Sequence, residues 1–168
     1  QLIAEAVAHG RRIGHLGPQR DRPLLEGIAA SLVALDAAET VVCTGLFDDE
    51  SETPDTYAAT LKMLCAQGAD MICANPDLTV ERGGKIVYCA GALAEAFAAR
   101  GGRVAYAGKP YPPVYRMAMQ ALEDLRGGPV AKSGVLAIGD GVHTDIAGAA
   151  AAGIDSVYIA SGVHLGAG

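Results

Sequence analysis

A lysine in a glycine- and proline-bounded turn is the first residue of this sequence suited to chemistry. Lys109 lies in Gly108-Lys109-Pro110, directly after the apolar run 103–107. A fixed ammonium at a strand terminus suits a phosphate group, to which lysine presents a compact positive charge. The segment is not a Walker-type loop, which requires glycine where Arg103 stands and serine or threonine where Pro110 stands. A solvated lysine in a surface turn is the alternative.

Two aspartates form the second candidate. Asp140 and Asp145 follow the apolar run 135–138. Two like charges ~4 Å apart repel by about 4 kcal/mol at an effective dielectric of 20, so a bare anion is disfavoured beside Asp140. A divalent cation reverses that sign, and Mg²⁺ commonly takes one or two carboxylates together with waters and a phosphate. Helix capping by Asp145 is the alternative, and it leaves Asp140 unexplained.

The same segment partly imitates a dinucleotide-binding fingerprint. Gly139 and Gly141 are correctly spaced, but Thr144 stands where the third glycine belongs. Asp140 would also point a carboxylate at the pyrophosphate. A dinucleotide-binding domain is therefore disfavoured, and retention on a nucleotide column would revive it.

These residues must be positioned by strands that alternate with helices. Such alternation predicts a parallel α/β architecture, which binds ligands beyond the carboxyl ends of its strands. From residue 103 onward the pattern predicts an uninterrupted β-α-β-α-β order. Strands are predicted at 12–16, 40–44, 71–74, 85–88, 103–107, 135–138 and 156–159, and helices at 2–8, 54–66, 91–99, 113–125 and 144–152.

With the elements in place, the two turns resemble the third and fourth motifs of the haloacid dehalogenase (HAD) superfamily of hydrolases. Gly108-Lys109-Pro110 precedes Gly139-Asp140-x4-Asp145 by about 30 residues. Three further segments resemble the class IIA branch, which places a large α/β cap between its second and third motifs. They are Cys73-Ala74-Asn75-Pro76-Asp77, Cys89-Ala90-Gly91-Ala92-Leu93 and the stretch from Gly148-Ala149 to Gly153.

The resemblance implies a Mg²⁺-dependent phosphatase that works through an aspartyl-phosphate. It implies that Lys109 neutralises the nucleophile and the transferring phosphoryl group. Asp140 would ligate Mg²⁺, and Asp145 would hold that ligand and its waters. These roles agree with the general logic of phosphoryl transfer, in which positioning and charge neutralisation do most of the catalysis. The expected substrate is a small phosphorylated metabolite.

One departure from the family concerns its first motif. The nucleophile of the family lies in an Asp-x-Asp motif, and none occurs in these 168 residues. The nearest acidic cluster, residues 48–50, is predicted to be a solvated loop. The chain begins at Gln1 and has its first methionine at Met63. We therefore expect an incomplete chain, inactive alone, whose first and second motifs lie upstream. Residues 1–102 would be most of the cap, and 103–168 the distal half of a doubly wound, parallel-sheet HAD core.

Substrate specificity is assigned to the cap by the resemblance. Thr44, Asn75 and Asp77 lie at predicted strand ends and are candidate substrate-binding residues. Because Asn75-Pro76-Asp77 is also a good turn sequence, a structural role is an equal alternative. For the whole chain, the alternative function is a non-catalytic α/β module that binds phosphate. An Asp-x-Asp-Gly motif upstream would favour the enzyme.

Composition restricts the partners. Hydrophobic residues make up 51% of the chain, enough for a core, and the net charge of −6 argues against nucleic acid. No apolar run reaches the ~18 residues of a membrane span. The four cysteines form no Cys-x-x-Cys pair and lie in apolar surroundings, which indicates buried thiols in a reducing cytoplasm. The sequence leaves the oligomeric state undetermined.

Overall fold

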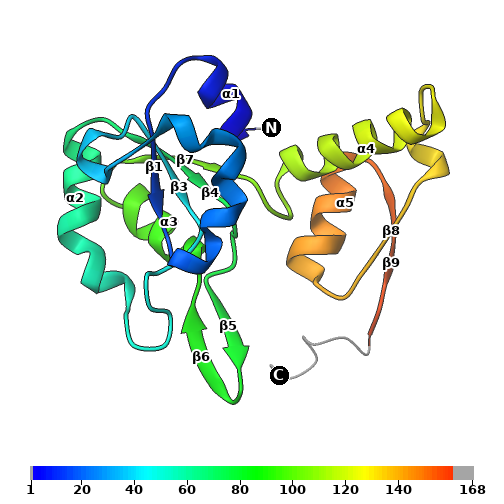
Figure 1. Cartoon of the computed structure of the whole chain (residues 1–168). Coiled ribbons are helices and arrows are strands. Elements are labelled where there is room, and N and C mark those ends of the chain that lie inside the picture. Colours follow the sequence, from blue (N-terminus) through cyan, green and yellow to red (C-terminus); the bar gives the residue numbers. More distant parts are fainter. Residues whose placement is uncertain (1, 161–168) are drawn as a thin grey trace. The chain divides into compact units, whose positions relative to one another are not determined.

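The computed structural model describes residues 2–160. The chain divides into two compact units, Gln1–Ala107 and Gly108–Gly168, and each is described by itself (Figure 1). Within the described residues, no helix is both long and apolar enough to cross a membrane.

A five-stranded sheet, parallel throughout, organises the first unit. Its register aligns Leu16, Cys43, Cys73 and Tyr106, so the carboxyl ends of four strands meet at one edge. Loops that leave this edge are where a parallel sheet places ligand contacts. In spatial order the strands are β2 (Leu32–Val33), β1 (Ile13–Leu16), β3 (Thr40–Cys43), β4 (Asp70–Cys73) and β7 (Arg103–Tyr106).

Helices cover both faces of this sheet, because its strands are apolar on both sides. Val41 packs in the larger core with α2 (Ala58–Ala66) and α3 (Ala90–Ala98). Its neighbour Val42 packs in the smaller core, on the face that carries α1 and η1. The remaining helical segments are α1 (Leu2–Ala8), the 3-10 segment η1 (Gln19–Ser31), η2 (Leu35–Ala37) and η3 (Pro54–Tyr57).

An antiparallel hairpin extends from the first unit as a separate two-stranded sheet (Figure 1). It consists of β5 (Thr79–Arg82) and β6 (Lys85–Tyr88). Gly83 and Gly84 form its turn with φ of 59° and 77°, the positive values that a two-residue hairpin turn requires. The sequence analysis predicted the second strand and missed the first, although paired glycines between two β-prone runs favour a hairpin.

The second unit is built around two parallel strands, β8 (Leu136–Gly139) and β9 (Asp155–Tyr158). The chain between them forms a π-helical turn, η5 (Val142–Ile146), and helix α5 (Ala147–Ala152). Apolar side chains on both strands are exposed, among them Ile138 at 67% and Leu136 at 55%. The unit also contains α4 (Pro112–Arg126) and the 3-10 turn η4 (Lys132–Gly134).

The parallel α/β fold expected from the sequence is confirmed, with one rearrangement. The strand predicted at 103–107 was grouped with the C-terminal part, yet β7 pairs with β4 in the first unit. The reason is packing, because Val104 and Tyr106 lie against the larger core of that unit. Strand periodicity indicates that a strand forms and does not identify its partner. The two compact units are divided after Ala107, and the assignment of residues 1–102 to a cap and 103–168 to a core stays a prediction.

Candidate active site

Lys109 and Asp145 form an ion pair in the second unit. Lys109 precedes α4 in a turn closed by the Tyr111 N–H on the Gly108 carbonyl, and its peptide bond to Pro110 is cis. Its ammonium donates to Oδ1 of Asp145 at 2.5 Å. The lysine side chain is 54% exposed and the aspartate 14%. The aspartate is therefore the anchored partner, and the lysine presents an accessible cation.

The loop after β8 holds the Asp145 carboxylate from the other side. Oδ2 accepts the Gly141 N–H at 3.0 Å, and the backbone N–H of Asp140 also stabilises the anion. Gly139 makes this approach possible, because a Cβ there would lie 2.4 Å from Cβ and Cγ of Asp145. Asp145 therefore does not cap α5, the alternative considered from the sequence. It closes the turn that follows β8.

Electrostatics fix the charges of this pair. The hydrogen bond from Lys109 is the main cause that lowers the pKa of Asp145, helped by the Gly141 N–H and opposed by burial. The same bond is the main cause that raises the pKa of Lys109, and the Asp140 carboxylate adds to it. Both pKa shifts favour the charged forms, so at neutral pH the pair consists of the Lys109 ammonium and the Asp145 carboxylate.

Tyr115, on α4, stabilises the backbone of this loop. Its hydroxyl lies 3.3 Å from the carbonyl oxygens of both Thr144 and Asp145 and donates to them. These carbonyls belong to η5, where the widened hydrogen-bond spacing interrupts the α-helical ladder. A Cβ at position 148 would lie 2.1 Å from this hydroxyl, so Gly148 provides the space for the ring. Sequence patterns do not predict this contact, because 29 positions separate Tyr115 from Thr144.

Asp140 and Asp145 are the oxygen ligands that this loop offers to a metal. Asp140 follows β8 directly, and its charge acts on Lys109. Among residues 2–160, no group of three or more His, Cys, Asp or Glu side chains is arranged to hold a metal. The donor set nevertheless fits Mg²⁺, which is commonly held by one or two carboxylates while waters and phosphate oxygens complete the shell.

The three substrate-binding candidates lie in the first unit, and two of them line a pocket whereas the third does not. Thr44 and Asn75, which follow β3 and β4, line one pocket of about 100 Å³. Asp77 is exposed, and its N–H donates to Oδ1 of Asn75 at 3.1 Å. Its carbonyl accepts the Gly91 N–H. The turn interpretation of Asn75-Pro76-Asp77 thus describes the local geometry, and the substrate contacts remain predictions.

Three charged residues in that pocket were missed by the sequence analysis. Nη2 of Arg20 and Nη1 of Arg82 donate to the same oxygen of Asp49, Oδ2, at 2.6 and 3.1 Å. Asp49 is 10% exposed, so the expectation of a solvated acidic loop is wrong for this residue. These side chains come from η1, the hairpin and the loop after β3, and no local spacing relates them. We call this hollow the Arg20–Arg82 pocket.

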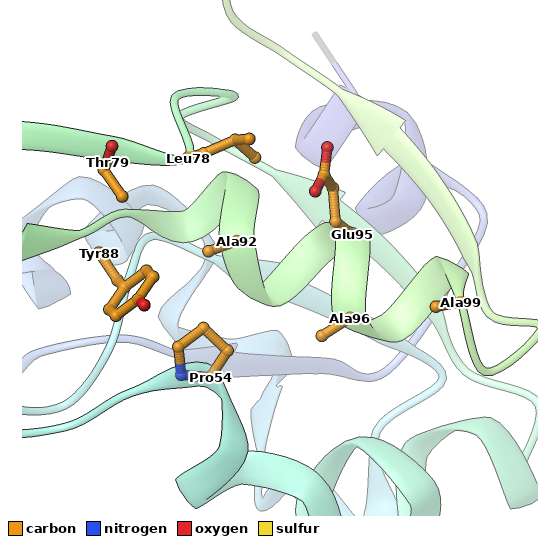
Figure 2. Close-up of a pocket in the computed structure, with 8 residues that line it drawn as sticks. All are labelled: Pro54, Leu78, Thr79, Tyr88, Ala92, Glu95, Ala96 and Ala99. Carbon is orange, nitrogen blue, oxygen red and sulfur yellow. The ribbon is translucent and has the colours of Figure 1, made fainter.

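A larger groove of about 520 Å³ lies beside α3. Figure 2 shows Pro54, Leu78 and Tyr88 near small side chains of that helix, with Glu95 as the only carboxylate drawn. This groove is mostly apolar and contains none of the candidate residues. We assign it no chemistry.

Comparisons with known proteins agree with the motif analysis. The HAD-hydrolase-like family model matches residues 106–167. A solved haloacid dehalogenase-like hydrolase from Brucella suis is 48% identical, with a TM-score of 0.83 over 95% of this chain. No protein of curated function matches the sequence. The resemblance to HAD-like hydrolases that the motifs indicated is therefore confirmed.

More distant structures share the fold alone. A thermostable NPPase from Geobacillus stearothermophilus is 21% identical, with a TM-score of 0.74 over 96% of this chain. A p-nitrophenyl phosphatase from Archaeoglobus fulgidus is 22% identical, with a TM-score of 0.67 over 93% of this chain. This chain spans 62% of the length of the Brucella and Geobacillus proteins and 58% of the Archaeoglobus protein.

Proposed function

We propose that this chain, whose fold is that of HAD-like hydrolases, belongs to a Mg²⁺-dependent phosphatase of small phosphomonoesters. The observation that carries the proposal is the Lys109–Asp145 ion pair beside Asp140. It presents an accessible cation next to carboxylate oxygens at the end of a parallel strand, an arrangement suited to a phosphoryl group and its metal ion. The phosphatases among the structural neighbours support this substrate class by analogy of fold.

Lys109 is the proposed catalytic residue. Its raised pKa keeps it protonated at neutral pH, and its exposure leaves it accessible to a bound phosphate. An ammonium at this position lowers the energy of negative charge on the transferring oxygens, the largest single contribution in many phosphoryl transfers. Asp145 orients it, because that carboxylate is itself fixed by two backbone N–H groups.

Asp140 is the proposed ligand of Mg²⁺, with Asp145 in support of that site. When bound, the ion would shield phosphate oxygens from the nucleophile and the surrounding carboxylates. The nucleophile is proposed to lie outside these 168 residues, which contain no Asp-x-Asp motif. The first unit corresponds to the class IIA cap under this proposal, and the compartment to the cytoplasm.

Hydrolysis of p-nitrophenyl phosphate tests the proposal in the complete protein, meaning this chain with its natural upstream sequence. We expect turnover that requires Mg²⁺ and falls by about 100-fold or more in Asp140→Asn. Asp124→Asn, on exposed α4, is the matched control and should retain activity. Near-normal turnover of Asp140→Asn at saturating Mg²⁺ would show that the metal site is misplaced. Phosphate binding without turnover would favour the non-catalytic module.

A further inference from the structure

The Arg20–Arg82 pocket has the form of a ligand site at the edge of the first unit's sheet. It lies at the carboxyl ends of β3 and β4, where Thr44 and Asn75 contribute to its lining. Parallel sheets bind ligands at this edge, because loops from neighbouring strands converge there. The hairpin contributes Arg82 from β5, so three separate parts of the chain supply polar groups to one hollow.

The charges in this pocket are unequal. Two guanidinium groups share one carboxylate oxygen, Oδ2 of Asp49. A guanidinium has five N–H donors, and one oxygen cannot accept them all. The arginine side chains are 59% and 54% exposed, whereas Asp49 is 10% exposed. Asp49 thus anchors two accessible cations, and the lining has one positive charge in excess. Asp77, whose charge also acts on the pocket residue Cys89, is exposed and lies outside the lining.

Stability alone explains this arrangement poorly. The nearly buried carboxylate of Asp49 needs a cationic partner, and one arginine meets that need. A second arginine on the same oxygen adds little further stability, because its half-exposed side chain is screened by solvent and costs entropy to hold. A planar guanidinium can hold an anion through two parallel N–H bonds, and each of these arginines keeps N–H donors that Asp49 does not use.

Neutral groups of the pocket are also positioned. Oγ1 of Thr44 lies 2.9 Å from Nε2 of His15. A Cβ at position 17 would lie 2.0 Å from that hydroxyl, so Gly17 leaves room for the pair. Thr44 therefore brings a hydroxyl of fixed position to the lining, and a hydroxyl can donate to an oxygen-rich ligand.

We propose that the Arg20–Arg82 pocket binds an anionic group, a carboxylate or a phosphate, of a small ligand. The volume of about 100 Å³ admits a group of that size and is too small for a nucleoside. Every group in this lining belongs to the first unit, so the ligand proposed here is a free anionic metabolite that this unit binds by itself.

Calorimetric titration with succinate tests this site in the complete protein. Arg20→Gln and Arg82→Gln should each weaken succinate binding by about tenfold. Each single variant keeps one arginine on Asp49, and circular dichroism verifies the fold. Arg100→Gln, exposed in the same unit, is the control.

Titration with inorganic phosphate in the same proteins shows whether the pocket also accepts that anion. If succinate and phosphate both fail to bind, or bind equally well to the wild type and to both arginine variants, the proposal is overturned. Loss of p-nitrophenyl phosphate turnover, with arginine-dependent anion binding intact, would instead refute the proposed function and leave this site standing.

Discussion

Gly139→Ala perturbs the candidate active site without altering any charged group. In β8, a Cβ at this position would lie 2.4 Å from Cβ and Cγ of Asp145, whereas ordinary contacts begin at 3.4 Å. The aspartate must therefore retreat by about 1 Å, which pulls its carboxylate away from Lys109. A misplacement of about 1 Å can reduce turnover ~100-fold. Overpacking should also destabilise the fold by about 1–3 kcal/mol.

Gly134→Ala is the matched control. A Cβ at position 134 meets no atom within 4 Å, and neither Gly134 nor Gly139 has the positive φ that resists substitution. We expect the free energy of unfolding of the Gly134→Ala variant to equal that of the wild type or to exceed it by up to ~1 kcal/mol, because alanine restricts the unfolded chain.

The assay is kcat for p-nitrophenyl phosphate in the complete protein, with thermal melts of both variants. We expect Gly139→Ala to lose about 100-fold in kcat while most of the protein remains folded at the assay temperature. Turnover within about threefold of wild type would refute the reasoning, since it would mean that the position of Asp145 does not matter.

Three further predictions follow from the same loop and from the exposed strands. Because the pKa of Asp145 is lowered in the folded state, its contribution to stability is complete above the ordinary value near 3.9 and is lost as pH falls through the folded pKa. Urea titrations should therefore show the wild type more stable than Asp145→Asn at pH 7, with the difference vanishing in acid. Tyr115→Phe removes the hydroxyl contacts to η5 and should lower the free energy of unfolding by about 0.5–1.5 kcal/mol, measured by urea unfolding; no change would mean that these long contacts contribute nothing. The 168 residues alone should show no phosphatase turnover and should self-associate through the apolar strand residues Ile138 and Leu136, which sedimentation velocity would detect. Turnover by the chain alone would place a nucleophile within it, and a monodisperse monomer would refute the association.

The candidate active-site residues could be located because the sequence around each of them is distinctive. A lysine between glycine and proline, and two aspartates after an apolar run, identify strand ends without knowledge of the tertiary structure. The contact between Lys109 and Asp145 could not be predicted, since these residues are 36 positions apart. Spacing assigned Asp145 to the metal, and the structure shows that its carboxylate also holds the lysine.

Other features depend on packing that sequence patterns do not encode. β7 was grouped with the C-terminal residues, although it pairs with β4, because a short apolar strand fits either sheet. Tyr115 and Gly148 are complementary in shape only after α4 and α5 pack together. Arg20, Asp49 and Arg82 meet through three unrelated loops and strands. The hairpin, in contrast, could have been predicted from the sequence, because Gly83-Gly84 between two β-prone runs favours a hairpin turn.

The most direct test of the central claim is the effect of Lys109→Met on the complete protein. Lys109 is proposed to act on the phosphoryl group, and its half-exposed ion pair should contribute only about 0.2–1 kcal/mol to folding. The account predicts that kcat for p-nitrophenyl phosphate falls by at least ~100-fold. It also predicts that the melting temperature stays within about 4 °C of wild type. A large drop in melting temperature, with turnover retained by the folded molecules, would contradict it and make Lys109 a structural residue.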